Sequence, residues 1–513
     1  MSGGRPPLTT DRRLGPGAVL REGTMTSYRA VGVLDGEAHL IRDELHAGPG
    51  TAEPGRPLLC LAHITDLQLA DVQSPTRFEF LNGRWADPRY AGLWPVQRPQ
   101  ELLTAHAVDA VIQTLRNVRG PATGLSPSLA VTTGDAIDNA QWNELQMFLA
   151  LIDGGLVAPD SGGPAYEGVQ APDWPDDIFW VPDNGKDLFR REFGFPHHPG
   201  LLDRALRSFF ADGLGVPWLA CFGNHEALNQ GVGVVTPQLA ALLTGDKKPT
   251  SLPDGFPHER AIELFTSEPQ AFMAGPHRQI TADPGRRPIT RQDFVRAHLS
   301  PGARPHGHGF TERNLTDGTT YYAWDTPDVR FIALDTNCLA GGANGCLDRR
   351  QARWLEDRLA ETDDRLVIVF SHHGSDTLDN TRHPGPDGDM LLGGTELIAI
   401  LRRYPQVVLW LNGHTHTNAI RPHDSFWEVT TCAIADWPCQ ARLIELVDHG
   451  GYLSIVATMV DHDTPLSPLS LDTRAELASL HRELAMNIPL DVLAFAGQVT
   501  DRNVELRLGI TPP

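Results

Sequence analysis

Five apolar segments, each followed at once by polar residues, constrain this chain more than any other feature of its sequence. The segments read LLCLAHI, LAVTT, WLACF, LVIVF and VVLWLN. Short apolar runs bounded by glycine or polar residues are typical of strands that are buried on both faces, as in parallel sheets. Because open α/β folds gather the carboxyl ends of such strands along one edge, we expect the polar residues to meet there.

The polar blocks behind these segments are rich in oxygen and nitrogen donors. In chain order they are TDLQ at 65–68, GDAID at 134–138, GNHE at 223–226, SHHG at 371–374 and GHTH at 413–416. Carboxylate, amide and imidazole groups together are suited to divalent metals of the first transition row. The blocks therefore predict a site for a pair of metal ions at the carboxyl edge of the sheet.

The order and spelling of the blocks resemble the calcineurin-like metallophosphoesterase superfamily. Its pattern is D-x-H, G-D-x-x-D, G-N-H-D/E, a histidine after a strand, and G-H-x-H. The resemblance runs from about residue 58 to about residue 460 and departs at Gln68, where the family has histidine. It implies an α/β fold with a central β-sandwich of mixed sheets flanked by helices, interrupted here by two large insertions.

The resemblance also implies how two divalent metal ions would be held, with manganese preferred over iron or zinc. Asp135 would bridge the ions. The other ligands would be Asp66, Gln68 and His416 at the first ion, and Asn224, His372 and His414 at the second. A metal-bridging hydroxide would attack phosphorus, and His225 would assist the leaving group as a general acid. Asp138 is assigned a catalytic part as an acceptor that orients an imidazole.

The implied activity is hydrolysis of a small-molecule phosphodiester or phosphomonoester, because both reactions use the same metal pair. The alternative is a non-catalytic pseudoenzyme that binds metal and phosphate. Gln68 leaves three interpretations open: a substitute ligand through its amide oxygen, a residue that points away from a labile first metal, or a sign of a degenerate site. Since every other ligand position is intact, we prefer the substitute ligand.

Other polar residues near the blocks have structural interpretations. His63, inside the first strand, is expected to be a buried, hydrogen-bonded histidine. His373 could face the metal instead of His372, and the choice between them follows the family pattern. Asp335 is expected to be structural, and Asp436 is assigned to the pocket rim.

The chain divides into three parts by composition and motif position. We predict an irregular N-terminal segment at 1–57, a metallophosphoesterase domain at 58–465 and a C-terminal appendix at 466–513 with a helix near 472–486. The insertions lie at about 154–210 and 228–318. Aromatic residues of the first are expected to form a local mini-core, and a capping role beside the metal edge is plausible. Further helices are predicted at 100–119, 139–151, 348–360 and 393–403.

Composition and charge limit the classes of partner and the cellular compartment that we expect. The formal net charge is −21, and three of the 43 basic residues are lysines. Such an acidic surface argues against non-specific binding to nucleic acid or anionic membranes. No apolar run is long enough to span a bilayer, and the N-terminus lacks a secretory signal. We therefore expect a cytoplasmic protein whose partner is a small-molecule phosphate ester, without nucleic-acid or membrane partners.

The chain contains six cysteines. Cys338 with Cys346, and Cys432 with Cys439, are close enough in the chain to pair, although spacing alone does not establish a disulfide.

Overall fold

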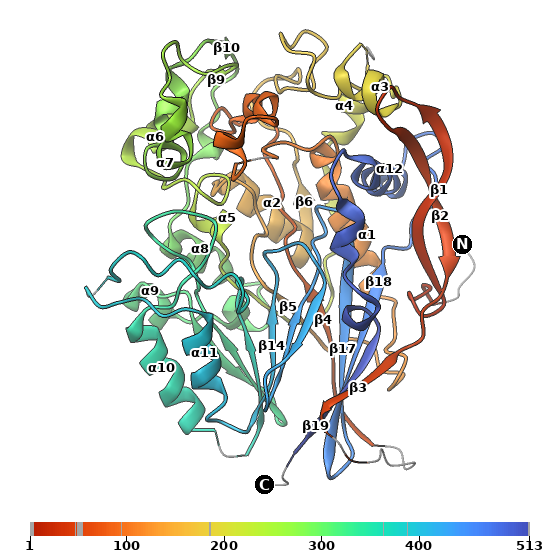
Figure 1. The fold of residues 1–513 in the computed structure, drawn as a ribbon, viewed down its shortest axis with the longest axis vertical. Helices are drawn as coiled ribbons and strands as arrows, with labels where there is room; N and C mark the ends of the chain where they lie inside the picture. The colour runs from red at the N-terminus through yellow and green to blue at the C-terminus, as the bar shows by residue number, and fades with distance from the viewer. Residues whose placement is uncertain are drawn as a thin grey trace.

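The computed structural model describes residues 5–46, 48, 55–93, 95–183, 186–362, 364–386 and 388–510. Within them, two mixed sheets form a β-sandwich with helices outside (Figure 1). The seven-stranded sheet has, in spatial order, β3 (Leu40–Leu45), β19 (Val504–Gly509), β18 (Tyr452–Asp461), β17 (Gln440–Asp448), β4 (Arg56–Ile64), β5 (Leu129–Thr132) and β8 (Trp218–Leu219). The six-stranded sheet has β11 (Tyr322–Asp325), β12 (Val329–Ala333), β13 (Leu366–Phe370), β14 (Val407–Asn412), β16 (Trp427–Thr430) and β15 (Ala419–Pro422).

The five apolar segments are strands or lead into strands, as the sequence predicted. Strands β4, β5 and β8 run parallel to one another in one sheet, and β13 and β14 run parallel in the other. The main core lies between the sheets, where residues of both are fully buried, among them Leu61, Val131, Phe370, Leu411 and Leu443. The five polar blocks therefore emerge at one end of the sandwich, three from one sheet and two from the other.

The four helices predicted within the central region are present. They are α1 (Thr104–Leu115), α2 (Trp142–Asp153), α10 (Arg349–Ala360) and α11 (Gly394–Leu401). Helices α10 and α11 cover the outer face of the six-stranded sheet (Figure 1), where their leucines pack with Val369 and Val407. Strands β11 and β12 form an antiparallel hairpin.

The prediction of an irregular segment at 1–57 is wrong. Strands β1 (Arg12–Glu22) and β2 (Ser27–Asp35) form an antiparallel ribbon, and β3 joins the seven-stranded sheet. The ribbon lies outside α12 (Arg474–Asn487) in Figure 1, with Tyr28 and Val31 buried against that helix. Few other ribbon residues are buried, so the segment lacks the apolar alternation that identifies a strand in sequence.

The C-terminal residues are likewise no appendix. The predicted helix exists as α12, and β19 pairs with β18 and, in parallel, with β3. Leucines of α12 share a core with Leu102 and Leu103 at the start of α1. Segments from both the N-terminal and the C-terminal part of the described chain are therefore built into the sandwich, because β19 and β3 complete one edge of the seven-stranded sheet.

The two insertions carry short elements of their own. The first holds β6 (Gly155–Val157), α3 (Leu188–Phe193), α4 (Leu201–Ala205) and β7 (Phe209–Ala211). The third polar block opens α5 (Asn224–Ala227), and the second insertion continues with α6 (Pro237–Leu243), β9 (Lys247–Pro249), α7 (Ala261–Ser267), β10 (His277–Gln279), α8 (Arg291–His298) and α9 (Glu312–Asp317). Trp174 and Phe179 form the expected mini-core with Val169, but Trp180 joins the core beneath the β1–β2 ribbon.

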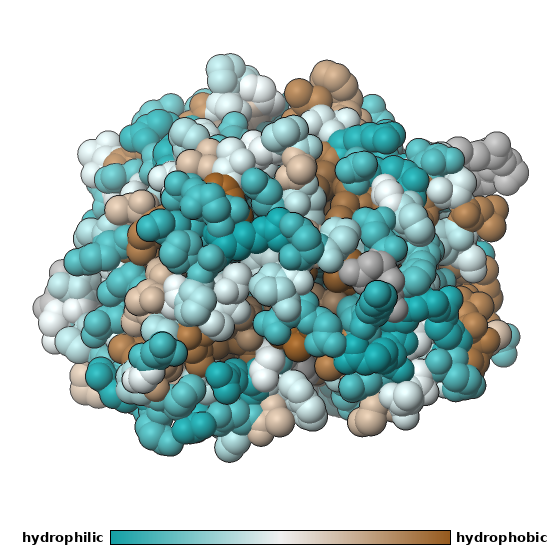
Figure 2. Space-filling model, turned by 90° about the horizontal axis from the view of Figure 1, so that it is seen from above, coloured by the Kyte–Doolittle hydropathy of each residue, from teal (hydrophilic) through white to brown (hydrophobic). Residues whose placement is uncertain are grey.

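The surface agrees with the acidic composition. The face seen from above in Figure 2 is mostly hydrophilic, with apolar residues scattered between polar ones. Among the described residues, no helix combines the length and apolarity that crossing a bilayer requires.

Candidate metal centre

Left-handed backbone at five predicted ligands turns the chain sharply where it leaves the strands. The φ angles are 50° at Asp66, 43° at Gln68, 51° at Asp135, 70° at His414 and 56° at His416. Such angles are uncommon for residues other than glycine, and they gather at functional sites where the surrounding structure holds them in place. These turns let side chains from separate strands converge on one point.

Carboxylates and imidazoles meet at this point. His372 Nε2 lies 3.1 Å from Asp135 Oδ2 and 3.1 Å from His414 Nδ1. His416 Nε2 lies 3.4 Å from Asp66 Oδ1. One ligand atom each of Asp66, Asp135 and His372 falls within a span of 4.8 Å. The structure thus brings together carboxylates and imidazoles from the first, second, fourth and fifth blocks.

Two buried oxygens in the cluster accept no hydrogen bond, which fits a cation. They are Asp66 Oδ1 and Asn224 Oδ1, the latter supplied by the third block. Unpaired buried polar atoms are rare in native proteins and call for a partner. Burial by itself would raise the pKa of Asp135, yet His372 and His225 lower it below its usual range. An ionised carboxylate together with unpaired buried oxygens suits a divalent ion.

Glu226 fixes the second and third blocks relative to each other. Its carboxylate accepts backbone N–H groups from Gly223 at 2.6 Å, Asp135 at 2.9 Å, Ala136 at 2.7 Å and Ile137 at 3.2 Å. Glu226 thereby holds two backbone turns together.

His225 lies beside the shared carboxylate and is anchored by Asp138. Its Nε2 is 3.8 Å from Asp135 Oδ2, and its Nδ1 is 2.7 Å from the Asp138 carbonyl oxygen and 3.5 Å from Asp138 Oδ1. Burial would lower the pKa of His225, but Asp135 and Asp138 raise it to about 10. Arg77 Nε in turn lies 3.0 Å from Asp138 Oδ2. The ring is therefore held in place and can carry a proton.

Gln68 faces His225. The Gln68 amide nitrogen lies 3.2 Å from His225 Nε2, and the amide oxygen accepts a hydrogen bond from Arg98 at 3.4 Å. Within the described chain, the Gln68 side chain makes no hydrogen bond to the carboxylate of Asp66 or Asp135.

Two residues support His416: Asp436, which the sequence analysis assigned to the pocket rim, and Arg98, which it did not single out. Asp436 Oδ2 lies 2.6 Å from His416 Nδ1, and Asp436 Oδ1 lies 3.0 Å from Arg98 Nε. Burial would raise the pKa of Asp436, but Arg98 and His416 lower it to about 2, so it remains ionised. Carboxylates in this position orient a histidine toward a metal. Asp436 follows a strand behind the last block, which was a usable signal, whereas nothing in the sequence singled out Arg98.

The prediction for His63 is confirmed. Its Nε2 lies 2.9 Å from Thr133 Oγ1 and its Nδ1 lies 2.8 Å from Thr431 Oγ1. Burial, assisted by the charge of Arg442, lowers the pKa of His63 to about 3. This histidine is thus a neutral, fully paired core residue.

His373 uses both ring nitrogens away from the carboxylates. Nδ1 lies 2.8 Å from Thr336 Oγ1, and Nε2 lies 2.8 Å from the Ala343 carbonyl oxygen. One of its nitrogens nevertheless comes within 4.8 Å of ligand atoms of His372 and His414. Because His372 alone of the adjacent pair contacts Asp135, the geometry favours His372 as the ligand.

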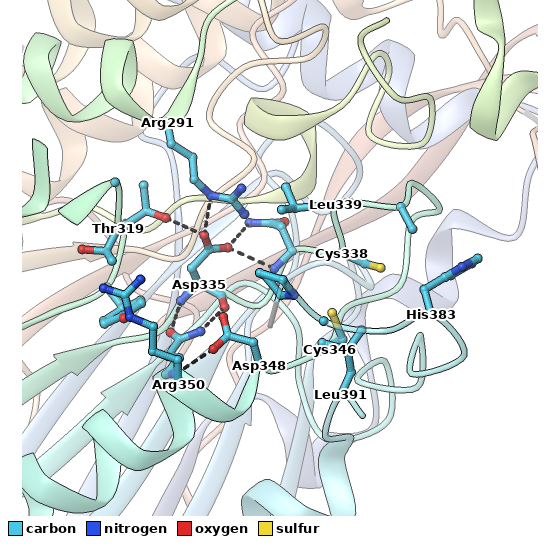
Figure 3. A pocket seen from close by; sticks show the side chains of 18 of the residues that line it. Arg291, Thr319, Asp335, Cys338, Leu339, Cys346, Asp348, Arg350, His383 and Leu391 are labelled. Atoms are coloured by element: carbon cyan, nitrogen blue, oxygen red, sulfur yellow. Dashed lines mark hydrogen bonds and ion pairs between the residues drawn. The ribbon is translucent and has the colours of Figure 1, made fainter. Parts of the chain in front are cut away.

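A cavity of about 370 Å³ lies beyond the end of β12, and none of the predicted ligands lines it. Figure 3 shows Arg291 pointing at Asp335, with the sulfur atoms of Cys338 and Cys346 further along the wall. Arg291 Nε lies 2.8 Å from Asp335 Oδ2, which also accepts a hydrogen bond from Thr320. Asp335 is therefore structural, as predicted. All six cysteines are free thiols.

Comparison with known proteins gives one family match. The model of the calcineurin-like phosphoesterase family matches residues 177–418, which contain the third, fourth and fifth blocks. No curated protein matches the chain.

Three solved structures are similar to it at low identity. GAP50, the anchor in the inner membrane complex of Plasmodium, has 11% identity and a TM-score of 0.28 over 83% of this chain and 94% of that one. A putative 5'-nucleotidase from Staphylococcus aureus has 11% identity and a TM-score of 0.31 over 83% and 58%. The sulfate thiohydrolase SoxB from Thermus thermophilus has 13% identity and a TM-score of 0.26 over 78% and 55%.

This chain thus spans little more than half the length of the last two of those structures. Residues 177–418, slightly less than half of the chain, thus match the calcineurin-like phosphoesterase family, and the ordered blocks and the convergence of their side chains agree with that match.

Proposed function

We propose that this protein is a metal-dependent hydrolase of phosphoric esters that acts on a small-molecule phosphodiester or phosphomonoester. One observation carries the proposal. Ligand atoms of Asp66, Asp135 and His372 lie within 4.8 Å of one another, and His225 stands 3.8 Å from the carboxylate in their midst. A cation site with a proton donor beside it is what in-line hydrolysis of a phosphate ester needs.

The residues that would hold two divalent ions follow from the contacts. Asp135 would be shared, Asp66 and His416 would belong to the first ion, and the second would take Asn224, His372 and His414. Gln68 is the remaining candidate at the first ion. When bound, such ions supply positive charge for the ester oxygens and an activated water as nucleophile. Oxygen and imidazole donors without a thiolate support manganese before iron or zinc.

His225 would deliver a proton to the leaving oxygen as the P–O bond breaks. Its Nδ1 is anchored at the Asp138 carbonyl oxygen, which leaves Nε2 directed toward the shared carboxylate. Asp138 acts through His225 by fixing the ring, and Arg77 holds the Asp138 carboxylate. A general acid placed in this way contributes about 10²–10⁴ in rate.

The partner that best suits this molecule is a small phosphate ester. The net charge of −21 repels long polyanions, which supports a small substrate over nucleic acid. Both insertions pack near the first block, since Ser161 and Arg286 contact Asp71. That placement supports a capping role. The cytoplasmic location stays a prediction from sequence.

The test is hydrolysis of an aryl phosphomonoester and of its bis-aryl diester by protein stripped of metal and reloaded with Mn²⁺. We expect metal-dependent turnover that is reduced but still measurable in His225→Ala, because the leaving oxygen then lacks its proton donor. His277→Ala, which alters an exposed histidine of β10, serves as the matched control and should behave as the unaltered protein does. The ratio of the two rates would show the preference for monoester or diester.

Gln68 supports one alternative, a non-catalytic protein that binds metal and phosphate. Stoichiometric metal uptake without turnover of either ester, together with binding of inorganic phosphate, would favour this alternative over the hydrolase.

A further inference from the structure

Gln68 is the one position at which the first block departs from the family pattern, and its contacts point to a different task. We propose that Gln68 is a positioning residue for His225, held by Arg98, and that it is no ligand of the first metal. The inference rests on the proposed function, because His225 is taken as the group that protonates the leaving oxygen.

The hydrogen bond at Nδ1 of His225 leaves Nε2 available for contact with the amide of Gln68. Nδ1 is 2.7 Å from the Asp138 carbonyl oxygen, which can only accept, so Nδ1 carries a hydrogen. His225 Nε2 then lies 3.2 Å from the amide nitrogen of Gln68. Because Gln68 Oε1 accepts from Arg98, the amide nitrogen of Gln68 is the atom that faces His225 Nε2, and it donates to the lone pair of that nitrogen. The Gln68 amide and the Asp138 carbonyl oxygen therefore fix the orientation of the His225 ring from both of its nitrogens.

Arg98 engages the other end of the Gln68 amide. Its guanidinium donates to Gln68 Oε1 at 3.4 Å and is itself fixed by Asp436 at 3.0 Å and Glu101 at 3.6 Å. The amide oxygen, which is the atom that would bind a metal, thus already accepts from a cation. A divalent ion on that oxygen would be brought close to the guanidinium, and like charges repel strongly at such separations.

The backbone limits any rearrangement of Gln68. Its N–H donates to the Asp135 carbonyl oxygen at 2.9 Å, its φ is 43°, and the residue is 6% exposed. Gln68 is therefore held in a fixed relation to the block that carries the shared carboxylate. The first ion would keep Asp66, Asp135 and His416 as protein ligands, which leaves positions for water and substrate oxygens.

The first experiment compares bound metal in the unaltered protein and in Gln68→Met, a variant of similar length without an amide. After reloading with Mn²⁺ we expect two ions per chain in both proteins and unchanged metal affinity. A drop toward one ion, or an affinity weakened by more than about tenfold, would identify Gln68 as a ligand and overturn the proposal. Gln113→Met, which alters a half-buried glutamine of α1, is the control.

The second experiment varies the leaving group. Nitrophenyl phosphate needs little protonation of its leaving oxygen, whereas an alkyl phosphate needs it fully. If Gln68 positions His225, Gln68→Met should slow the alkyl ester by roughly tenfold or more and the nitrophenyl ester by less than about threefold. Equal losses on both esters would contradict the proposal, because a weakened metal site affects every substrate alike.

A double-mutant cycle separates this inference from the proposed function. In a His225→Ala background, Gln68→Met should cause no further loss with the alkyl ester, since the group it positions is gone. Fully additive losses would overturn the inference while leaving the hydrolase intact. If the unaltered protein hydrolyses no ester, the proposed function fails instead, and the metal content of Gln68→Met still decides whether Gln68 is a ligand.

Discussion

The two halves of the metal centre are built in different ways. In the half that holds His372 and His414, His372 Nε2 lies 3.1 Å from both His414 Nδ1 and Asp135 Oδ2, and the backbone carbonyl oxygen of Thr133 lies 2.8 Å from His372 Nδ1. In the half that holds Asp66 and His416, the support comes from charged side chains.

The half that holds Asp66 and His416 is called the first half, because it would hold the first ion. In it, His416 is oriented by Asp436 at 2.6 Å, and Arg98 links Asp436 to Gln68. The first half is also where the sequence departs from the family pattern. We infer that a half built on backbone contacts can be recognised from its motif, whereas a half built on a charge network depends on residues that lie outside any motif.

The largest effect is expected for the residue that both halves share. Asp135→Asn removes the bridging charge, so we expect loss of both ions and a fall in turnover of at least about 10⁴-fold. Metal analysis and steady-state rates with the aryl esters measure this. Asp376→Asn, which alters an aspartate paired with Arg421, should leave both quantities unchanged. Retention of one ion with near-normal turnover would show that the halves do not share Asp135.

A smaller effect is expected when a ligand of only one ion is removed. His372→Ala should release one ion, keep the other and slow turnover on the order of 10³-fold, because a single ion cannot clamp both ester oxygens. The neighbouring His373→Ala is the comparison, since both nitrogens of His373 are engaged elsewhere, and it should retain two ions. The opposite result would transfer the ligand role to His373.

The charge network of the first half predicts a still milder phenotype. Asp436→Asn weakens the acceptor that orients His416, so we expect about 10–100-fold weaker binding of the first ion and no change at the second. Competition with a metal chelator separates the two affinities. Asp335→Asn, which alters a carboxylate paired with Arg291, should change neither affinity. Equal weakening of both ions would remove the distinction between the halves.

The smallest effect is expected for a substitution of His63. It tests whether His63 serves as a metal ligand in place of the histidine that is missing at Gln68. His63→Gln should keep both ions and turnover within about threefold, because the nitrogens of His63 pair with Thr133 and Thr431. The free energy of unfolding should fall by about 1 kcal/mol, the value of one imperfectly replaced hydrogen bond. Urea denaturation measures that change, and loss of an ion would make His63 a hidden ligand.

Much of the central fold was predictable, because its signals are local. Strand β14 at 407–412 and helix α10 at 349–360 lie where continuous apolar runs and helical periodicity placed them. The N-terminal ribbon was missed because Tyr28 and Val31 are nearly its only buried residues. The role of β19 was missed as well, since pairing with β3 and β18 joins segments far apart in the chain and leaves no local pattern.

The sequence by itself determined the blocks, their order and their position at strand ends, since donor type and apolar runs are properties of neighbouring residues. It thereby identified Asp66, Asp135 and His372, whose ligand atoms lie together in the structure. Only the tertiary structure decided that Asp436 lies behind His416 and that Arg98 lies between Asp436 and Gln68, and it identified His225 as the imidazole that Asp138 contacts. Those partners act through contacts between segments that are distant in sequence, so folding alone brings their charges within reach.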